Sequence, residues 1–98
     1  MIYWTRSKKS LKMIHFKQKK FVSETVGSDI LIIDHQQGLL ITLNQTSSFV
    51  WNLLKTPKTK LEIIEKFSHK YGKDKSEDAK TALRKLLASG VIVKFESD

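Results

Sequence analysis

The chain has 98 residues, the length of one compact domain, and 40% of them are hydrophobic, which is enough for a small core. Because it contains no cysteine, disulfide frameworks and thiolate metal sites are excluded, and no apolar run approaches the roughly 18 residues that a membrane-spanning helix needs. The basic N-terminus lacks the continuous apolar core of a signal peptide, so we expect a cytoplasmic protein without a membrane span.

The formal net charge of +8 is distributed unevenly along the chain. Residues 1–20 contain seven basic residues and no acidic one, so the rest of the chain is nearly neutral. We therefore expect a basic N-terminal arm at residues 1–20 and a folded domain at residues 21–98. The arm mixes lysines with apolar residues, which fits a disordered tail, an anchor on a partner enzyme, or a surface helix on an anionic membrane. The favoured interpretation is a partly disordered segment that becomes ordered on a partner.

Three β-strands are predicted at residues 21–26, 30–33 and 39–43. The first mixes β-branched and aromatic residues and stops at Gly27, and the second is a short, continuously apolar run. Gly38 precedes the third strand and is able to adopt the positive φ of a tight turn. Such short connections predict an antiparallel meander, in which the third strand is an edge with unpaired backbone N–H and C=O groups.

Three helices and a short final strand are predicted after this meander. Asn44 and Thr46 are candidate N-caps of the first helix, and Pro57 ends it. Thr59 and Glu62 have the spacing of a capping box at the start of the second helix. The sequence therefore predicts an α+β fold: a small winged helix-turn-helix-like domain, in which a three-stranded antiparallel sheet is followed by three helices and a short C-terminal strand. The predicted apolar faces are Leu61, Ile64, Phe67 and Ser68 in the second helix, and Ala79, Ala82, Leu83, Leu86 and Leu87 in the third.

No group of residues in the sequence has the pattern of a catalytic or metal centre. His15, His35 and His69 fall in three separate predicted segments, and none has a second ligand at the usual spacing. The sequence has no glycine-rich phosphate loop and no nucleophile elbow, and Asp29 and Asp34 are explained as turn formers. We therefore expect no catalytic residue, no metal and no cofactor, and a binding module rather than an enzyme.

Two kinds of binding module fit this order of elements. A winged-helix DNA-binding domain would place the third helix in the major groove, with Lys80, Arg84 and Lys85 on phosphates. The start of that helix, residues 74–78, carries three acidic side chains, which phosphates would repel. Nucleic acid is therefore the less favoured partner, although the basic arm suits salt-dependent, non-specific binding. A domain that shares only the fold and serves another interaction is a third hypothesis.

The second kind of module is indicated by a resemblance. Residues 43–54 read LNQTSSFVWNLL, which is similar to the LNPTAAFIWELL phrase of PqqD-like proteins, the leader-recognition elements of peptide-modification pathways. The similarity continues in order through the Tyr71-Gly72 pair and the Leu86-Leu87-x-x-Gly90 end of the third helix, and it covers about residues 21–95. Gln45 departs from the family, which usually has proline there, and the basic arm is not part of the shared core.

The resemblance implies a non-catalytic protein that binds the leader of a ribosomally made precursor peptide. It would present the peptide to a modifying enzyme or a leader peptidase, in a lasso-peptide, quinone-cofactor or similar pathway. The leader would add as an extra strand at residues 38–43, and its side chains would enter a groove walled by residues 79–87. Strand addition to an open edge gives affinity through main-chain hydrogen bonds and specificity through side-chain pockets. The predicted peptide-binding residues are Leu39, Leu40, Ile41 and Thr42 through their backbone, and Ala79, Lys80, Leu83, Arg84 and Leu87 through their side chains.

Overall fold

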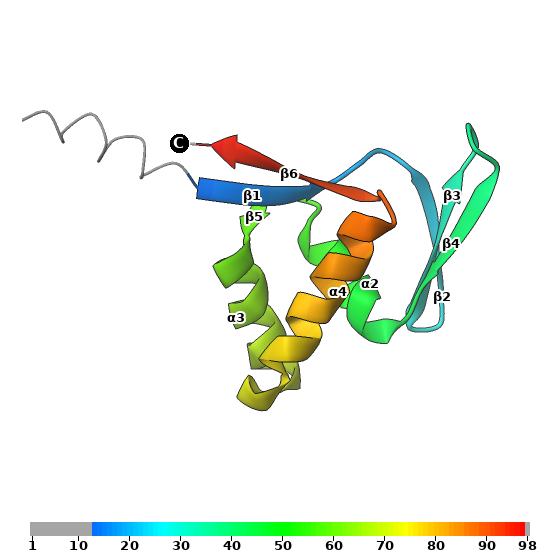
Figure 1. Cartoon of the computed structure of the whole chain (residues 1–98). Coiled ribbons are helices and arrows are strands. Elements are labelled where there is room, and N and C mark those ends of the chain that lie inside the picture. The colour runs from blue at the N-terminus through cyan, green and yellow to red at the C-terminus, as the bar shows by residue number, and fades with distance from the viewer. Residues whose placement is uncertain (1–12, 98) are drawn as a thin grey trace, which may run out of the picture.

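The computed structural model describes residues 13–97 and contains two three-stranded antiparallel sheets and three α-helices (Figure 1). One sheet has the order β5-β1-β6; the other, called the wing sheet below, has the order β2-β3-β4. This arrangement confirms the predicted α+β fold, its meander and its C-terminal strand. The elements are β1 (Met13–Gln18), β2 (Val22–Val26), β3 (Asp29–Asp34), β4 (Leu39–Leu43), α2 (Gln45–Leu53), β5 (Lys58–Thr59), α3 (Lys60–Tyr71), the 3₁₀ turn η1 (Lys73–Lys75), α4 (Ser76–Ala88) and β6 (Ile92–Ser97).

The wing sheet has one face on the core and one face toward solvent. Ile30 pairs with Leu43 and Ile32 pairs with Ile41, so these side chains share the inner face. Ile30, Ile32 and Leu43 are almost completely buried there. The tight turn between β3 and β4 is organised by Asp34, whose Oδ1 accepts hydrogen bonds from the backbone N–H groups of the two glutamines that follow. Asp34 is thus a turn former, as predicted.

Strand β1 corrects the expected boundary between arm and domain. Residues 13–18 were assigned to the basic arm, but they form a strand that pairs with β6 from Met13 opposite Ser97 to Gln18 opposite Ile92. Phe16 in this strand is only 6% exposed and belongs to the core. The segment has no strict alternation of apolar and polar residues, which hid its strand character, and its partner strand lies at the other end of the chain. The rest of the predicted arm, residues 1–12, lies outside the described residues.

The starts of two helices follow from local side-chain chemistry. The Asn44 side chain caps α2 by accepting from the backbone N–H of Ser47 at 3.0 Å. Both bonds of the predicted capping box are present at α3, from the Glu62 N–H to the Thr59 hydroxyl at 3.2 Å and from the Thr59 N–H to the Glu62 carboxylate at 2.8 Å. These bonds supply partners for backbone donors that the helices leave free.

The buried face of α3 is rotated relative to the prediction. Leu61 was expected on the apolar face, but it is 64% exposed, whereas Ile63 is completely buried together with Phe67. These two residues are four apart and therefore lie above one another on the helix surface. The position of α3 against α4 selects this face, and the pattern of the isolated helix does not reveal it.

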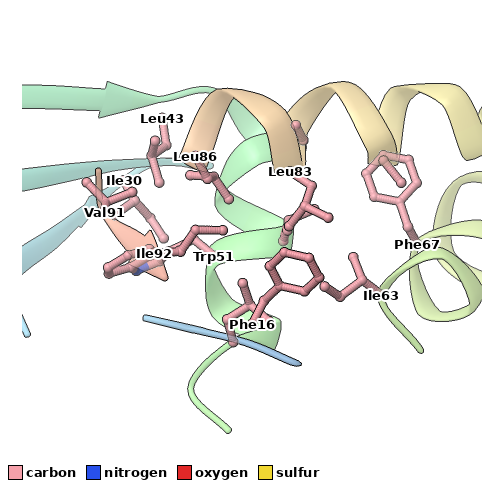
Figure 2. Packing of buried hydrophobic residues seen from close by; sticks show 14 of the residues in the cluster. Phe16, Ile30, Leu43, Trp51, Ile63, Phe67, Leu83, Leu86, Val91 and Ile92 are labelled. Atoms are coloured by element: carbon pink, nitrogen blue, oxygen red, sulfur yellow. The ribbon is translucent and has the colours of Figure 1, made fainter. Parts of the chain in front are cut away.

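The core joins both sheets to all three helices. Figure 2 shows Trp51 of α2 in the middle of the cluster, with Leu43 and Ile30 of the wing sheet on one side and Phe16 and Ile63 on the other. Phe49 and Tyr71 extend the cluster between α2 and α3 by edge-on ring contacts, with their centroids 5.5 Å apart. Through this core the wing sheet packs on α2, and its outer strand β4 lies beside the C-terminal end of α4.

Candidate functional site

The most accessible backbone hydrogen-bonding groups of the wing sheet lie on its two outer strands, β2 and β4. Strand β4 pairs with β3 on one side, and no other described strand pairs with its opposite side. Leu39 and Leu40 are 48% and 64% exposed, so the first half of β4 is open to solvent. An unpaired strand edge of this kind is a template for a further strand.

A groove runs between β4 and the C-terminal end of α4. It has a volume of about 330 Å³, and one wall consists of the end of β4 and the start of α2, while the other consists of the last turn of α4. The lining residues are Ile41, Thr42, Leu43, Asn44, Ser47, Lys85, Leu86, Ala88 and Ser89. An extended segment added to β4 would therefore have a helix beside it as well as a strand.

The two faces of β4 have different surroundings. Ile41 is half-buried and lies opposite the buried Ile32, on the face toward the helices. Leu40 and Thr42 lie on the outer face, opposite Ile33 and Leu31. Because neighbouring strands align their side chains face by face, alternate residues of a guest strand would point toward α4 and toward solvent. The groove can accordingly select the side chains at every second position.

The structure brings only part of the predicted peptide-binding set to this groove. Ile41 and Thr42 line it, and Leu39 and Leu40 continue its open edge. Ala79 and Leu83, which were predicted as groove residues, are 1% and 4% exposed and belong to the core, so their side chains are not accessible to a guest strand.

The other predicted residues of α4 lie outside the groove lining. The Lys80 ammonium is paired with the Glu77 carboxylate at 3.2 Å, and the Arg84 guanidinium donates to the Thr81 hydroxyl at 3.1 Å. Leu87 is half-buried against the core. The wall is built instead by Lys85, Leu86, Ala88 and Ser89. Lys85 and Leu86 fall within the predicted wall of residues 79–87, but none of the four was predicted as a peptide-binding residue.

The missed residues did carry a signal. Positions 85, 88 and 89 have the spacing of a stripe along one side of a helix, next to the apolar stripe that was recognised. The apolar stripe of α4 has a flank on either side, and the packing of α4 on α2 and α3 decides which flank faces β4.

The described residues contain no candidate metal centre. His15 is half-buried and stacks on Phe95 with ring centroids 5.8 Å apart, while His35 and His69 are exposed on separate elements. Within residues 13–97, no three histidine, aspartate or glutamate side chains gather in a way that could hold a metal ion. In the same part of the chain, no helix has the length and apolar character required to cross a membrane.

Comparison with known proteins gives two findings. The model of a family described as coenzyme PQQ synthesis protein D (PqqD) matches residues 29–92, which run from β3 to the start of β6. The solved structure "TbiB1 in Complex with the TbiA(beta) Leader Peptide" is similar in fold, with a TM-score of 0.64 and 22% sequence identity. The similarity covers 78% of this chain and 93% of that one. No curated protein is similar enough to this chain to count as a relative.

Proposed function

Since this chain belongs to the PqqD family, we propose that it binds the leader segment of a ribosomally made precursor peptide at β4. The leader adds to β4 as a further antiparallel or parallel strand, and alternate side chains enter the groove beside α4. The protein itself carries out no reaction and presents the peptide to a modifying enzyme or leader peptidase. The observation that carries the proposal is the open edge of β4 facing the groove wall of α4.

The fold neighbour supports the same class of ligand. TbiB1 was solved in complex with a leader peptide, and its fold covers most of this chain. Family membership is the independent support, because the matched region includes β4, α2 and α4, the three elements that build the groove.

The physical chemistry of the edge fits a flexible peptide. A leader loses conformational entropy when it becomes ordered, so the complex needs more than main-chain hydrogen bonds. The groove supplies the additional contact through Ile41 and Ala88. Apolar leader side chains buried against these residues favour binding, and the backbone bonds to β4 set the register.

The direct test is a titration of the isotope-labelled full-length chain with synthetic leaders of candidate precursor peptides. We expect amide shifts at β4 and at the last turn of α4. The substitution Ala88→Trp fills the groove and should weaken binding about tenfold or more. Lys66→Trp places the same side chain on the exposed surface of α3 and should leave the affinity unchanged.

A proline pair tests strand addition itself. Adjacent residues of a strand direct their N–H groups to opposite sides, so one of Leu40→Pro and Ile41→Pro removes a donor toward β3 and the other removes a donor at the open edge. We expect the variant that loses the donor toward β3 to disturb the wing sheet. The variant that loses the donor at the open edge should keep the fold but no longer bind the leader. Duplex DNA that shifts residues of α4, with no response to the leader, would contradict the proposal and favour the winged-helix alternative.

A further inference from the structure

A second and larger concavity lies at the end of the wing sheet where β2 begins, β3 ends and β4 begins. Its volume is about 980 Å³, and three segments line it. They are residues 17–22, from the end of β1 to the start of β2, residues 33–37 at the β3–β4 turn, and Leu54, Lys55 and Pro57 after α2. Figure 1 shows the first of these segments bridging the two sheets. We call this concavity the lysine cleft.

Backbone hydrogen bonds hold the shape of the lysine cleft. The Gln18 N–H donates to the Leu54 carbonyl at 3.2 Å, and the Lys19 N–H donates to the Val91 carbonyl at 2.9 Å. The Gln18 side chain also donates to the Trp51 carbonyl at 2.6 Å. The β1–β2 connection is therefore tied to the end of α2 and to the start of β6, and the lysines that it carries project from a fixed segment.

The charge of the lysine cleft is strongly positive. Lys17, Lys19, Lys20 and Lys55 line it, and Asp34 is the one acidic residue in its lining. The Asp34 carboxylate already accepts two backbone hydrogen bonds within its own turn. Among residues 13–97 the ion pair that is present joins Lys80 to Glu77, on α4, so none of the cleft lysines has a carboxylate within ion-pair distance there.

The remaining sequence supplies no counter-charge from the N-terminal side, since residues 1–12 contain no acidic residue. Strand β6 ends beside Met13, at the opposite end of β1 from the cleft. The Lys17 ammonium lies over the Phe95 ring, 5.2 Å from its centroid. The other three lysines of the cleft repel one another, and an anionic occupant would relieve this repulsion.

The walls of the lysine cleft are partly apolar, which does not suit a nucleic-acid phosphate backbone. Phe21, Val22 and Ile33 place apolar surface beside the lysines, and Val22 is 53% exposed. The cleft has the volume of a ligand pocket, so it accepts a short extended segment rather than the surface of a folded enzyme. Carboxylates separated by apolar side chains match both the charge and the walls.

The position of the lysine cleft indicates which part of a bound peptide would reach it. The β3–β4 turn that lines it is followed by Gly38 and then by Leu39, the first residue of the open edge. A guest strand that runs past Leu39 leaves the wing sheet next to the cleft. We infer that the lysine cleft binds an acidic stretch of the same precursor peptide, adjacent to the segment that pairs with β4. This inference rests on the proposed function, but the cleft is a separate site with its own residues.

The first experiment uses a probe that needs no leader. Titrating the labelled full-length chain with hexaglutamate should shift the amides of residues 17–22, 34–37 and Lys55, and hexaglutamine should not. The double substitution Lys19→Glu with Lys55→Glu should weaken hexaglutamate binding about tenfold, and Lys66→Glu on α3, with the same change in charge per residue, should have little effect. Raising the salt from about 0.05 M to about 0.3 M should also weaken it.

Shifts spread evenly over all lysine-bearing surfaces would overturn the assignment. So would tighter binding of a six-nucleotide thymidylate at the same residues, because the cleft would then be a nucleic-acid site.

The second experiment joins the two sites. Four glutamates are appended to either end of the leader, with four glutamines as the control. We expect the glutamate tail to raise the affinity of the leader at one of its two ends only. The protein with Lys19→Glu and Lys55→Glu should bind this tailed leader no more tightly than the untailed one, and its affinity for the untailed leader should be unchanged. A leader that binds equally with every tail would refute the inference and leave the proposed function standing. A leader that fails to bind β4 while hexaglutamate still occupies the cleft would refute the proposed function instead.

Discussion

The hydroxyl of Ser48 donates a hydrogen bond to the backbone carbonyl of Leu43 over 3.0 Å, and both residues are buried. This bond ties the first turn of α2 to the last residue of β4. Asn44 lies between them and caps the same helix. Together the two side chains set the angle between the open strand and the helices, and hence the shape of the groove. They do so at the corner where the family usually has a proline and this chain has Gln45.

Ser48→Ala should lower the stability of the fold by about 1–2 kcal/mol, because the Leu43 carbonyl is left without its buried donor. Urea unfolding measures the change. Ser47→Ala is the matched control, since Asn44 caps the backbone N–H of Ser47 rather than its hydroxyl, and it should cost less. Equal losses in the two variants would show that the bond to Leu43 makes no special contribution.

Gln45→Pro should stabilise the protein by about 0.5–1 kcal/mol, because proline restricts the unfolded chain at a site that already suits it. Gln45 is the first residue of α2, a favoured position for proline, and Asn44 before it has the extended conformation that a following proline requires (φ −71°, ψ −179°). The midpoint of urea unfolding should rise with an unchanged slope. Thr46→Pro would force Gln45 out of its helical conformation and should lower the stability of the protein. If both variants were less stable than the native chain, the geometry described for the junction of β4 and α2 would be contradicted.

Phe16→Ala should cost about 3–5 kcal/mol, as expected for a large side chain removed from a core. Met13 lies in the same strand but is 52% exposed, so Met13→Ala should have only a small effect. Thermal unfolding of the two variants distinguishes a strand that belongs to the domain from a separate arm. If the two substitutions had the same small effect, β1 would not be part of the folded unit.

Glu62→Gln should change how stability depends on pH. Hydrogen bonds from the Thr59 backbone and hydroxyl hold the pKa of the Glu62 carboxyl below its usual value of 4.5. The ionised carboxylate therefore stabilises the fold above pH 4.5, and this contribution is lost as the pH falls through the lowered pKa. Glutamine keeps an acceptor oxygen for Thr59 without the charge. The native chain should exceed the variant in stability at about pH 7 and lose that advantage at about pH 3; a difference that stays constant would contradict the assignment.

The local elements were predictable because their causes are local. The meander follows from short apolar runs and from turns at Gly27 and Gly38, both of which adopt positive φ. The cap of α2 at Asn44 and the capping box of Thr59 and Glu62 depend on residues at most three apart. The resemblance over residues 43–54 pointed to the family that the comparison shows.

The sequence by itself thus determined the order of the elements, their caps and turns, and the family of the chain. Only the tertiary structure decided that Met13–Gln18 joins the fold, because its partner β6 begins more than seventy residues later. A strand without a strict alternation of apolar and polar residues shows its role only beside that partner. The tertiary structure also decided which flank of α4 faces β4, since Ala79 and Leu83 turn into the core while Lys85 and Ala88 reach the groove. Helix periodicity marks an apolar stripe, but the packing of three helices against two sheets sets the direction in which that stripe points.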